Sequence, residues 1–142
     1  MKQNQRLKNL LEKGVFIQAP GAYNALTAKI IEDQGFNTVY ITGYGTSAAN
    51  FGLPDIGLLT MTEMVDNAKR IVDAVEVPVI ADADTGYGNA INITRTVQEY
   101  EKAGVNAIHI EDQTWPKRCG HMMGKQVISQ DEMIEKIRAA VD

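Results

Sequence analysis

The stretch VIADADTGYG, residues 79–88, decides the fold that the sequence predicts. Together with the two apolar residues before it, its first half makes a compact apolar run at 77–81, typical of a fully buried parallel strand. The glycines at the end of the stretch stop the run. Asp82 and Asp84 therefore stand where the strand is expected to end.

These two carboxylates allow two interpretations. Side chains at positions i and i+2 of a strand leave the same face, which would place Asp82 and Asp84 about 7 Å apart. Both could then bind one hydrated divalent cation, and Mg2+ prefers oxygen ligands while it keeps several waters. The alternative is a plain turn, because Asp-Thr-Gly favours turns and Asp82 can bond to the backbone.

Composition excludes several classes of protein. The chain has 142 residues, of which 44% are hydrophobic and 23% charged, and this is typical of a single globular domain, residues 1–142. A net charge of -4 without a basic tract predicts neither nucleic acid nor membrane as a partner. No apolar run approaches the ~18 residues of a membrane span, and the polar start is unlike a signal peptide. We therefore expect a cytoplasmic protein.

Apolar spacing and helix caps predict alternating strands and helices. Helices are expected at residues 3–13, 25–34, 61–75, 90–103 and from 130 onward, and strands at 15–19, 37–42, 77–81 and 105–110. The last helix is expected to bury the stripe Met133, Ile134, Ile137 and Val141. Two loops, 43–61 and 111–128, are longer than ordinary connections and are expected to be functional.

Four strands that each lead into a helix predict an α/β fold with a parallel sheet, either open or curled into a barrel. The long loops and the paired carboxylates then meet at the carboxyl ends of the strands, where such folds bind ligands. A complete (β/α)8 barrel needs about 250 residues, so we expect the N-terminal half of a longer protein. Four strands alone leave two unpaired sheet edges.

A third carboxylate is expected at the same edge. Glu111 ends the fourth predicted strand as Asp82 and Asp84 end the third, and three converging carboxylates repel one another without a cation. A solvated loop charge is the alternative for Glu111. Asp55, in the first long loop, could support the site without contacting the cation directly, or it could be a turn residue.

The second long loop holds the chain's single cysteine among basic residues. Cys119 lies close in sequence to Lys117, Arg118 and His121, and all four are candidate catalytic residues. Positive neighbours favour the thiolate, which suits proton transfer or nucleophilic attack, and they would attract an anionic substrate. A zinc site is the weaker alternative, since no other residues supply four-ligand spacing. A further alternative is that Lys117 and Arg118 are a solvated charge pair and that His121 packs within the loop.

Taken together, the motifs resemble a known family. The loop KRCGH at 117–121, the stretch DADTGYG at 82–88 and HIEDQ at 109–113 are similar to the isocitrate lyase/phosphoenolpyruvate mutase superfamily. The likeness runs from about residue 21 to the last residue, and it favours the branch of 2-methylisocitrate lyase and 2,3-dimethylmalate lyase. It implies the first four units of a (β/α)8 TIM-type barrel. It also implies Mg2+, or alternatively Mn2+, at Asp82 and Asp84.

The resemblance assigns further roles by position. Glu111 and Asp55 would contribute to the metal site directly or through water. The segment Thr42-Gly43-Tyr44 matches the strand end that binds substrate in the family.

The second loop also acquires a role from the resemblance. Cys119 matches the acid/base of a mobile gating loop, where Gly120 would also contact the substrate.

The implied activity is Mg2+-dependent cleavage of a carbon–carbon bond. The substrate would be a 2-hydroxy di- or tricarboxylate of the 2-methylisocitrate or 2,3-dimethylmalate type, giving a 2-oxo acid and a second carboxylate. The implied partners are this small anionic substrate and further copies of the chain, a tetramer by resemblance. The alternatives are carboxyvinyl-carboxyphosphonate phosphonomutase, oxaloacetate hydrolase or decarboxylase, and an inactive truncated half-barrel that serves only in assembly.

Overall fold

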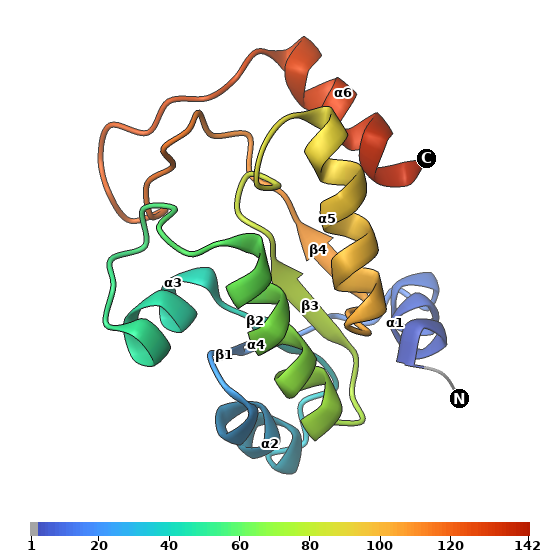
Figure 1. The fold of residues 1–142 in the computed structure, drawn as a ribbon. Coiled ribbons are helices and arrows are strands. Elements are labelled where there is room, and N and C mark those ends of the chain that lie inside the picture. The colour runs from blue at the N-terminus through green and yellow to red at the C-terminus, as the bar shows by residue number, and fades with distance from the viewer. Residues whose placement is uncertain (1–2) are drawn as a thin grey trace.

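A computed structural model describes residues 3–142 (Figure 1). The elements are, in chain order, α1 (Gln3–Glu12), β1 (Gly21–Ala22), α2 (Ala25–Asp33), β2 (Val39–Ile41), α3 (Gly43–Thr46), the π-helix η1 (Ser47–Phe51), α4 (Met61–Ala74), β3 (Val79–Asp82), α5 (Ala90–Lys102), β4 (Ala107–His109) and α6 (Gln130–Val141). The strands pair in parallel in the order β1-β2-β3-β4. This confirms the predicted α/β fold and its parallel sheet.

The two faces of the sheet differ in burial. Val39 and Ile41 of β2, like Val79 and Ala81 of β3, are buried in the core. Helices α4 and α5 lie in front of this face (Figure 1), and α2 packs against α4 and β1. Intervening residues point to the opposite face, because side chains alternate along a strand. That second face carries Asp82 at the carboxyl end of β3.

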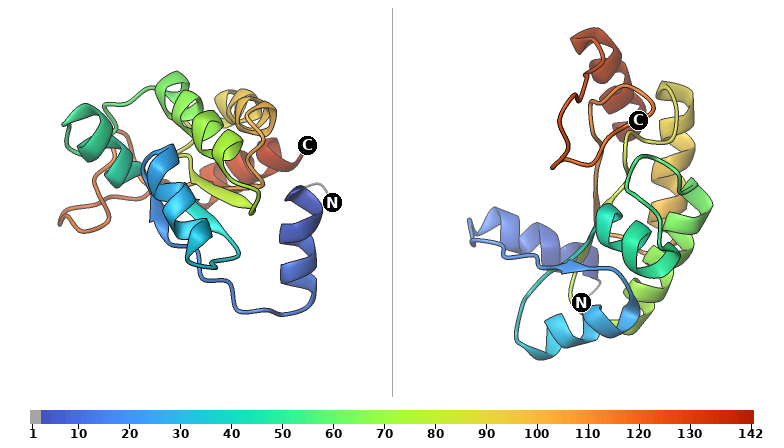
Figure 2. Two further views of the ribbon diagram at one scale, coloured as in Figure 1. Left: turned by 90° about the horizontal axis from the view of Figure 1, so that it is seen from below. Right: turned by 90° about the vertical axis from the view of Figure 1, so that its left-hand side faces the viewer.

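Helix α1 stands apart from α4 and α5, on the other side of the sheet (Figure 2). It is fastened by Leu7, which is buried, and by Arg6, whose Nη1 donates to the Glu76 carbonyl at 2.8 Å. Within the described part of the chain, no helix combines the length and the apolar character needed to cross a membrane.

The strand predicted at 15–19 is wrong. These residues form no regular element, and Phe16 is 82% exposed. The first strand is Gly21–Ala22. The hydrogen bonds to β2 fix this position of β1. The amide of Tyr40, in β2, donates to the Pro20 carbonyl, and the amide of Thr42, directly after β2, donates to the Ala22 carbonyl.

The first long loop is partly helical, which the sequence did not predict. Residues 43–51 form α3 and η1, and only 52–60 is irregular. The Thr42 hydroxyl begins α3 by accepting a hydrogen bond from the Gly45 amide at 3.1 Å. This short helical segment lacks an apolar stripe, which explains why periodicity did not reveal it.

Caps fix the starts of two helices next to the carboxyl edge of the sheet. Thr60 and Glu63 form a capping box at the start of α4. Asn89 caps α5 through the amides of Ile91 and Asn92. Both predicted helices are thereby confirmed at their amino ends.

The predicted burial of the last helix is wrong in part. Ile137 is 50% and Val141 78% exposed, whereas Lys136 is buried. The reason is that α6 packs against α5 and extends its lysine to the Thr85 carbonyl. The second long loop is irregular as predicted, apart from one isolated bridge between Gln113 and Val127.

The sheet edges generate a prediction about association. Among residues 3–142, β1 and β4 each pair with one neighbour only, so each leaves backbone donors and acceptors open to another strand. We expect the isolated 142-residue chain to self-associate in analytical ultracentrifugation. A monodisperse monomer that unfolds cooperatively in calorimetry would contradict this expectation.

Candidate active site

The carboxyl ends of β2 and β3 bring the predicted site residues together. The Asp82 carboxylate at the end of β3 accepts the Gly43 amide at 3.2 Å through Oδ2 and the Asp84 amide at 2.9 Å through Oδ1. A Cβ at Gly43 would lie 2.5 Å from Asp82 Oδ2, so only glycine allows this close approach. Asp82 thus fastens the start of α3 to the turn after β3.

That turn changes the expected direction of Asp84. The strand stops at Asp82, and Asp84 has a positive φ of 47°, so the two side chains do not leave one face of a continuous strand as the spacing suggested. The bond from the Asp84 amide to Asp82 is the turn interaction considered as the alternative. The segment is therefore a turn that also gathers carboxylates.

A buried ammonium group joins the two long loops. Lys117 Nζ lies 2.5 Å from Asp55 Oδ1 and 2.6 Å from Asp84 Oδ1, and the lysine is 1% exposed. Burial opposes the charge, but the hydrogen bonds with Asp55 and Asp84 outweigh it and hold the Lys117 pKa above its ordinary value. Lys117 is thus a fixed cation.

Burial changes the protonation of two carboxylates. It raises the pKa of Asp84 to about 6, although the Lys117 ammonium opposes the shift. Burial also raises the pKa of Glu111, again against the effect of Lys117. Neighbouring carboxylates, Asp82 and Asp55, add to both shifts. The edge therefore carries more acidic groups than Lys117 alone neutralises.

Glu111 is tied to the second long loop through a residue that sequence reasoning missed. Gln113 Nε2 donates to Glu111 Oε2 at 2.5 Å and to the Arg118 carbonyl at 2.8 Å, while Gln113 Oε1 accepts the Arg118 amide. Gln113 is buried. Its position in the HIEDQ stretch, two residues after Glu111, was the available signal.

The donor set fits a hard divalent cation. Asp84 Oδ1 is buried, and its partner is the Lys117 ammonium group at 2.6 Å. Asp82, Asp84 and Glu111 offer only oxygen, which Mg2+ and Mn2+ prefer. Across residues 3–142, however, no three acidic, histidine or cysteine side chains are already arranged as a metal cage. The carboxylates would have to close around the ion.

Basic side chains of the loop around Cys119 donate hydrogen bonds to backbone carbonyls of the same loop. Arg118 Nη1 donates to the Met123 carbonyl, and Lys125 Nζ to the carbonyls of Gly120 and Met122. Cys119 is buried, and in the described chain neither Lys117 nor Arg118 forms an ion pair or hydrogen bond with its sulfur. This arrangement differs from the expected ring of cations around a thiolate.

The other candidates take different positions. Thr42 uses its hydroxyl as a helix cap, whereas Tyr44 is 57% exposed beside it. Gly120 and His121 are exposed in the loop. The structure thus gathers the carboxylates and Lys117, and leaves Tyr44, Gly120 and His121 at the surface.

Sequence analysis also did not identify two aromatic residues, Tyr40 and His109, on the sheet face that carries Asp82. The Tyr40 and His109 rings lie 5.3 Å apart, on the same face as Asp82. Burial raises the pKa of Tyr40, and the charges of Asp82 and Glu111 raise it further. Strand alternation was the signal, because Tyr40 lies between the buried Val39 and Ile41.

Comparison with known proteins agrees with this geometry. Residues 7–142 match the family model described as phosphoenolpyruvate phosphomutase. The chain is 59% identical over 137 residues to the 2,3-dimethylmalate lyase of Eubacterium barkeri, covering 96% of this chain and 47% of the relative. It thus spans about half the length of that curated relative.

Solved structures give the same result. A crystal structure of 2,3-dimethylmalate lyase superposes with a TM-score of 0.93 at 44% identity, over 99% of this chain and 48% of that one. Phosphonopyruvate hydrolase in complex with oxalate and Mg2+ gives a TM-score of 0.90 at 37% identity, over 99% and 48%.

The chain belongs to the phosphoenolpyruvate mutase/isocitrate lyase superfamily. Its four strand-helix units correspond to the N-terminal half of the superfamily's TIM-type barrel.

The raised pKa of Asp84 predicts a pH-dependent stability. A carboxyl whose pKa rises from 3.8 to about 6 on folding stabilises the fold fully below pH 4, and this contribution is lost as the pH rises through 6. The unfolding free energy of Asp84→Asn, taken relative to that of wild type, should therefore increase by about 1 kcal/mol from pH 5 to pH 7. Urea unfolding in EDTA measures this difference, with Asp73→Asn as the matched surface control. An unchanged difference at the two pH values would contradict the buried acid.

Proposed function

We propose that the protein to which this chain belongs is a Mg2+-dependent lyase that cleaves a 2-hydroxy di- or tricarboxylate of the 2,3-dimethylmalate or 2-methylisocitrate type. The observation that supports this most is the buried set of carboxylates around Lys117, in a chain 59% identical to a 2,3-dimethylmalate lyase. A lyase is favoured over an inactive half-barrel because charges buried in this way are costly for a purely structural role.

The metal would be held by oxygen ligands of this chain. Asp82, Asp84 and Glu111 are the proposed ligands, and Asp55 would contribute through water, because its carboxylate contacts Lys117. When bound, Mg2+ supplies Lewis-acid stabilisation of the negative charge that develops on the substrate's oxygens. A phosphonopyruvate hydrolase with a similar fold was solved with Mg2+ and oxalate.

The chain's other residues would bind the substrate and move the proton. Thr42, Gly43 and the exposed Tyr44 side chain lie at the strand end where the substrate would bind, and the basic second loop would attract its carboxylates. As the carbon–carbon bond breaks, the hydroxyl passes its proton to a general base that the full protein would supply and becomes the carbonyl of the 2-oxo acid. The electron pair of the bond remains on the second fragment as an enolate. Cys119 would donate the proton that converts this enolate into the carboxylate product.

The surroundings of this reaction are also proposals. A small anionic carboxylate is the partner, and neither nucleic acid nor a membrane is expected from the charge distribution. By family resemblance the full protein would be a cytoplasmic homotetramer.

Phosphonate chemistry is the second candidate function. It is favoured by the family model, which is named for a phosphomutase, and by the structural likeness to phosphonopyruvate hydrolase. Carboxyvinyl-carboxyphosphonate phosphonomutase activity would use the same carboxylates. Oxaloacetate hydrolysis or decarboxylation would use them as well. The role of Cys119 separates these chemistries from the lyase.

The metal ligands predict one pair of variants. Asp82→Ala and Asp84→Ala in the full-length protein should abolish lyase activity and leave the fold intact, because removing one carboxylate relieves the repulsion among the rest. Activity against Mg2+ concentration, with circular dichroism for the fold, measures both effects. Asp73→Ala, on the exposed face of α4, is the matched control. Unchanged Mg2+ dependence in both variants would remove the metal-site assignment.

The thiol predicts a second effect. Cys119→Ser replaces an ionisable acid by a hydroxyl that does not titrate usefully. A general acid contributes about 10²–10⁴-fold, so kcat with 2,3-dimethylmalate should fall by that factor while KM changes little. Both constants should be measured from pH 6 to 9. A kcat within a few-fold of wild type throughout would exclude the proton-donor role and favour phosphonate chemistry.

A further inference from the structure

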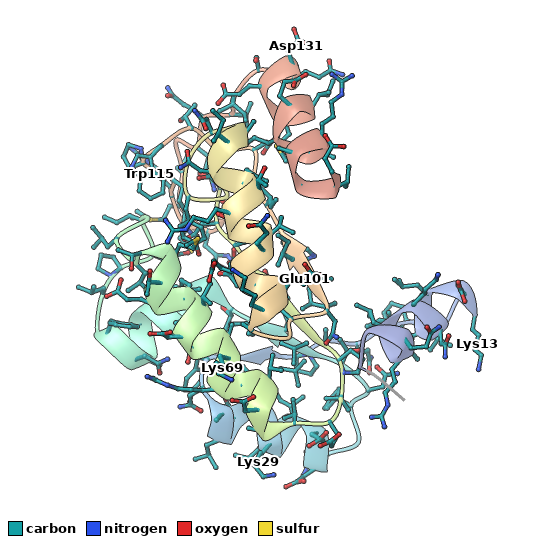
Figure 3. All side chains as sticks on the ribbon, turned by 45° about the vertical axis from the view of Figure 1, so that its right-hand side comes forward. Lys13, Lys29, Lys69, Glu101, Trp115 and Asp131 are labelled. Atoms are coloured by element: carbon teal, nitrogen blue, oxygen red, sulfur yellow. The ribbon has the colours of Figure 1, made fainter. Side chains whose placement is uncertain are left out.

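A cavity borders the carboxylate site without including its acidic side chains. Its volume is about 630 Å³, and it is bounded by the starts of α4 and α5, by α6 and by the second long loop. The acidic residues of the strand ends, as well as Lys117 and Cys119, are absent from the described residues that line it. Trp115, labelled in Figure 3, belongs to its wall. Its volume is within the usual range for small-molecule pockets.

The cavity wall contains a buried lysine that the proposed reaction does not use. Lys136 of α6 is 4% exposed, and its Nζ donates to the Thr85 carbonyl at 3.1 Å. Within residues 3–142, no carboxylate lies at ion-pair distance from this ammonium group, unlike the exposed Lys69, which pairs with Asp73. An ammonium group has three N–H donors. A buried positive charge with one neutral partner favours an anion beside it.

The remaining lining limits the chemistry of that anion. Apolar side chains make up much of the wall, among them Leu58, Met61 and Trp115, and two of these are more than half exposed. The charged lining residues of the described chain are Arg95 and Lys136 against the single acid Glu132. A ligand with one negative group and an apolar body would match both features.

We propose that this cavity binds an amphipathic monocarboxylate. Lys136 binds the carboxylate, and the apolar part of the ligand packs against Trp115 and Leu58. None of the proposed metal ligands lines the cavity, although Gln113, which binds Glu111, belongs to its wall. The proposal is independent of which substrate the lyase cleaves.

The test uses 4-phenylbutyrate and its neutral amide, 4-phenylbutyramide, as probes of the full natural protein. Trp115 lines the cavity, so its fluorescence reports occupancy, and Trp115→Phe identifies that signal among the protein's tryptophans. A charge-assisted hydrogen bond contributes about 1.5–3 kcal/mol. The acid should therefore bind at least about tenfold more tightly than the amide.

Three variants separate the lysine's role from general effects. Lys136→Met should lower affinity for the acid to that for the amide, whereas Lys69→Met, the matched surface control, should change neither. Glu132→Gln should raise affinity for the acid alone, and this variant serves if Lys136→Met does not fold. Equal binding of acid and amide, no binding of either, or unchanged acid affinity in Lys136→Met or Glu132→Gln would overturn the proposal.

Discussion

The contact of the Lys117 ammonium group with Asp55 and Asp84 is the interaction on which the arrangement of the site depends. It connects the two long loops through a lysine that is 1% exposed. Removing the lysine would leave two buried carboxylates without compensation, a situation that costs several kcal/mol. The same cation keeps these carboxylates within reach of the strand ends. Lys117 therefore links the stability of the loops to the geometry of the acidic site.

The parallel sheet provides the second constraint. Because all four strands run the same way, their carboxyl ends meet at one edge of the sheet. Asp82, Asp84 and Glu111 lie at this edge. The same edge brings Gly43 next to Asp82, although the two residues are far apart in sequence. Helices cover one sheet face, which leaves the other face to carry Tyr40 and Asp82 (Figure 1). A half-barrel with such a face is consistent with relatives about twice its length.

What the sequence could predict was local. The capping box of Thr60 and Glu63 and the apolar run that ends at Asp82 depend on neighbouring residues, and both are found in the structure. Burial of Lys136 and the partners of Lys117 depend on contacts between segments far apart in sequence, about which periodicity carries no information. The strand at 15–19 was misplaced for the same reason, since pairing with β2 rather than apolar content decides where β1 begins.

The central claim is that the carboxylates at the strand ends close around a divalent cation. The most direct test is a crystal structure of the full-length protein with Mn2+, which replaces Mg2+ at oxygen sites and scatters anomalously. The account predicts one anomalous peak, about 2 Å from oxygens of Asp82 or Asp84 or from waters that these residues bind. A fully occupied Mn2+ elsewhere, with Asp82 and Asp84 uncontacted, would contradict it.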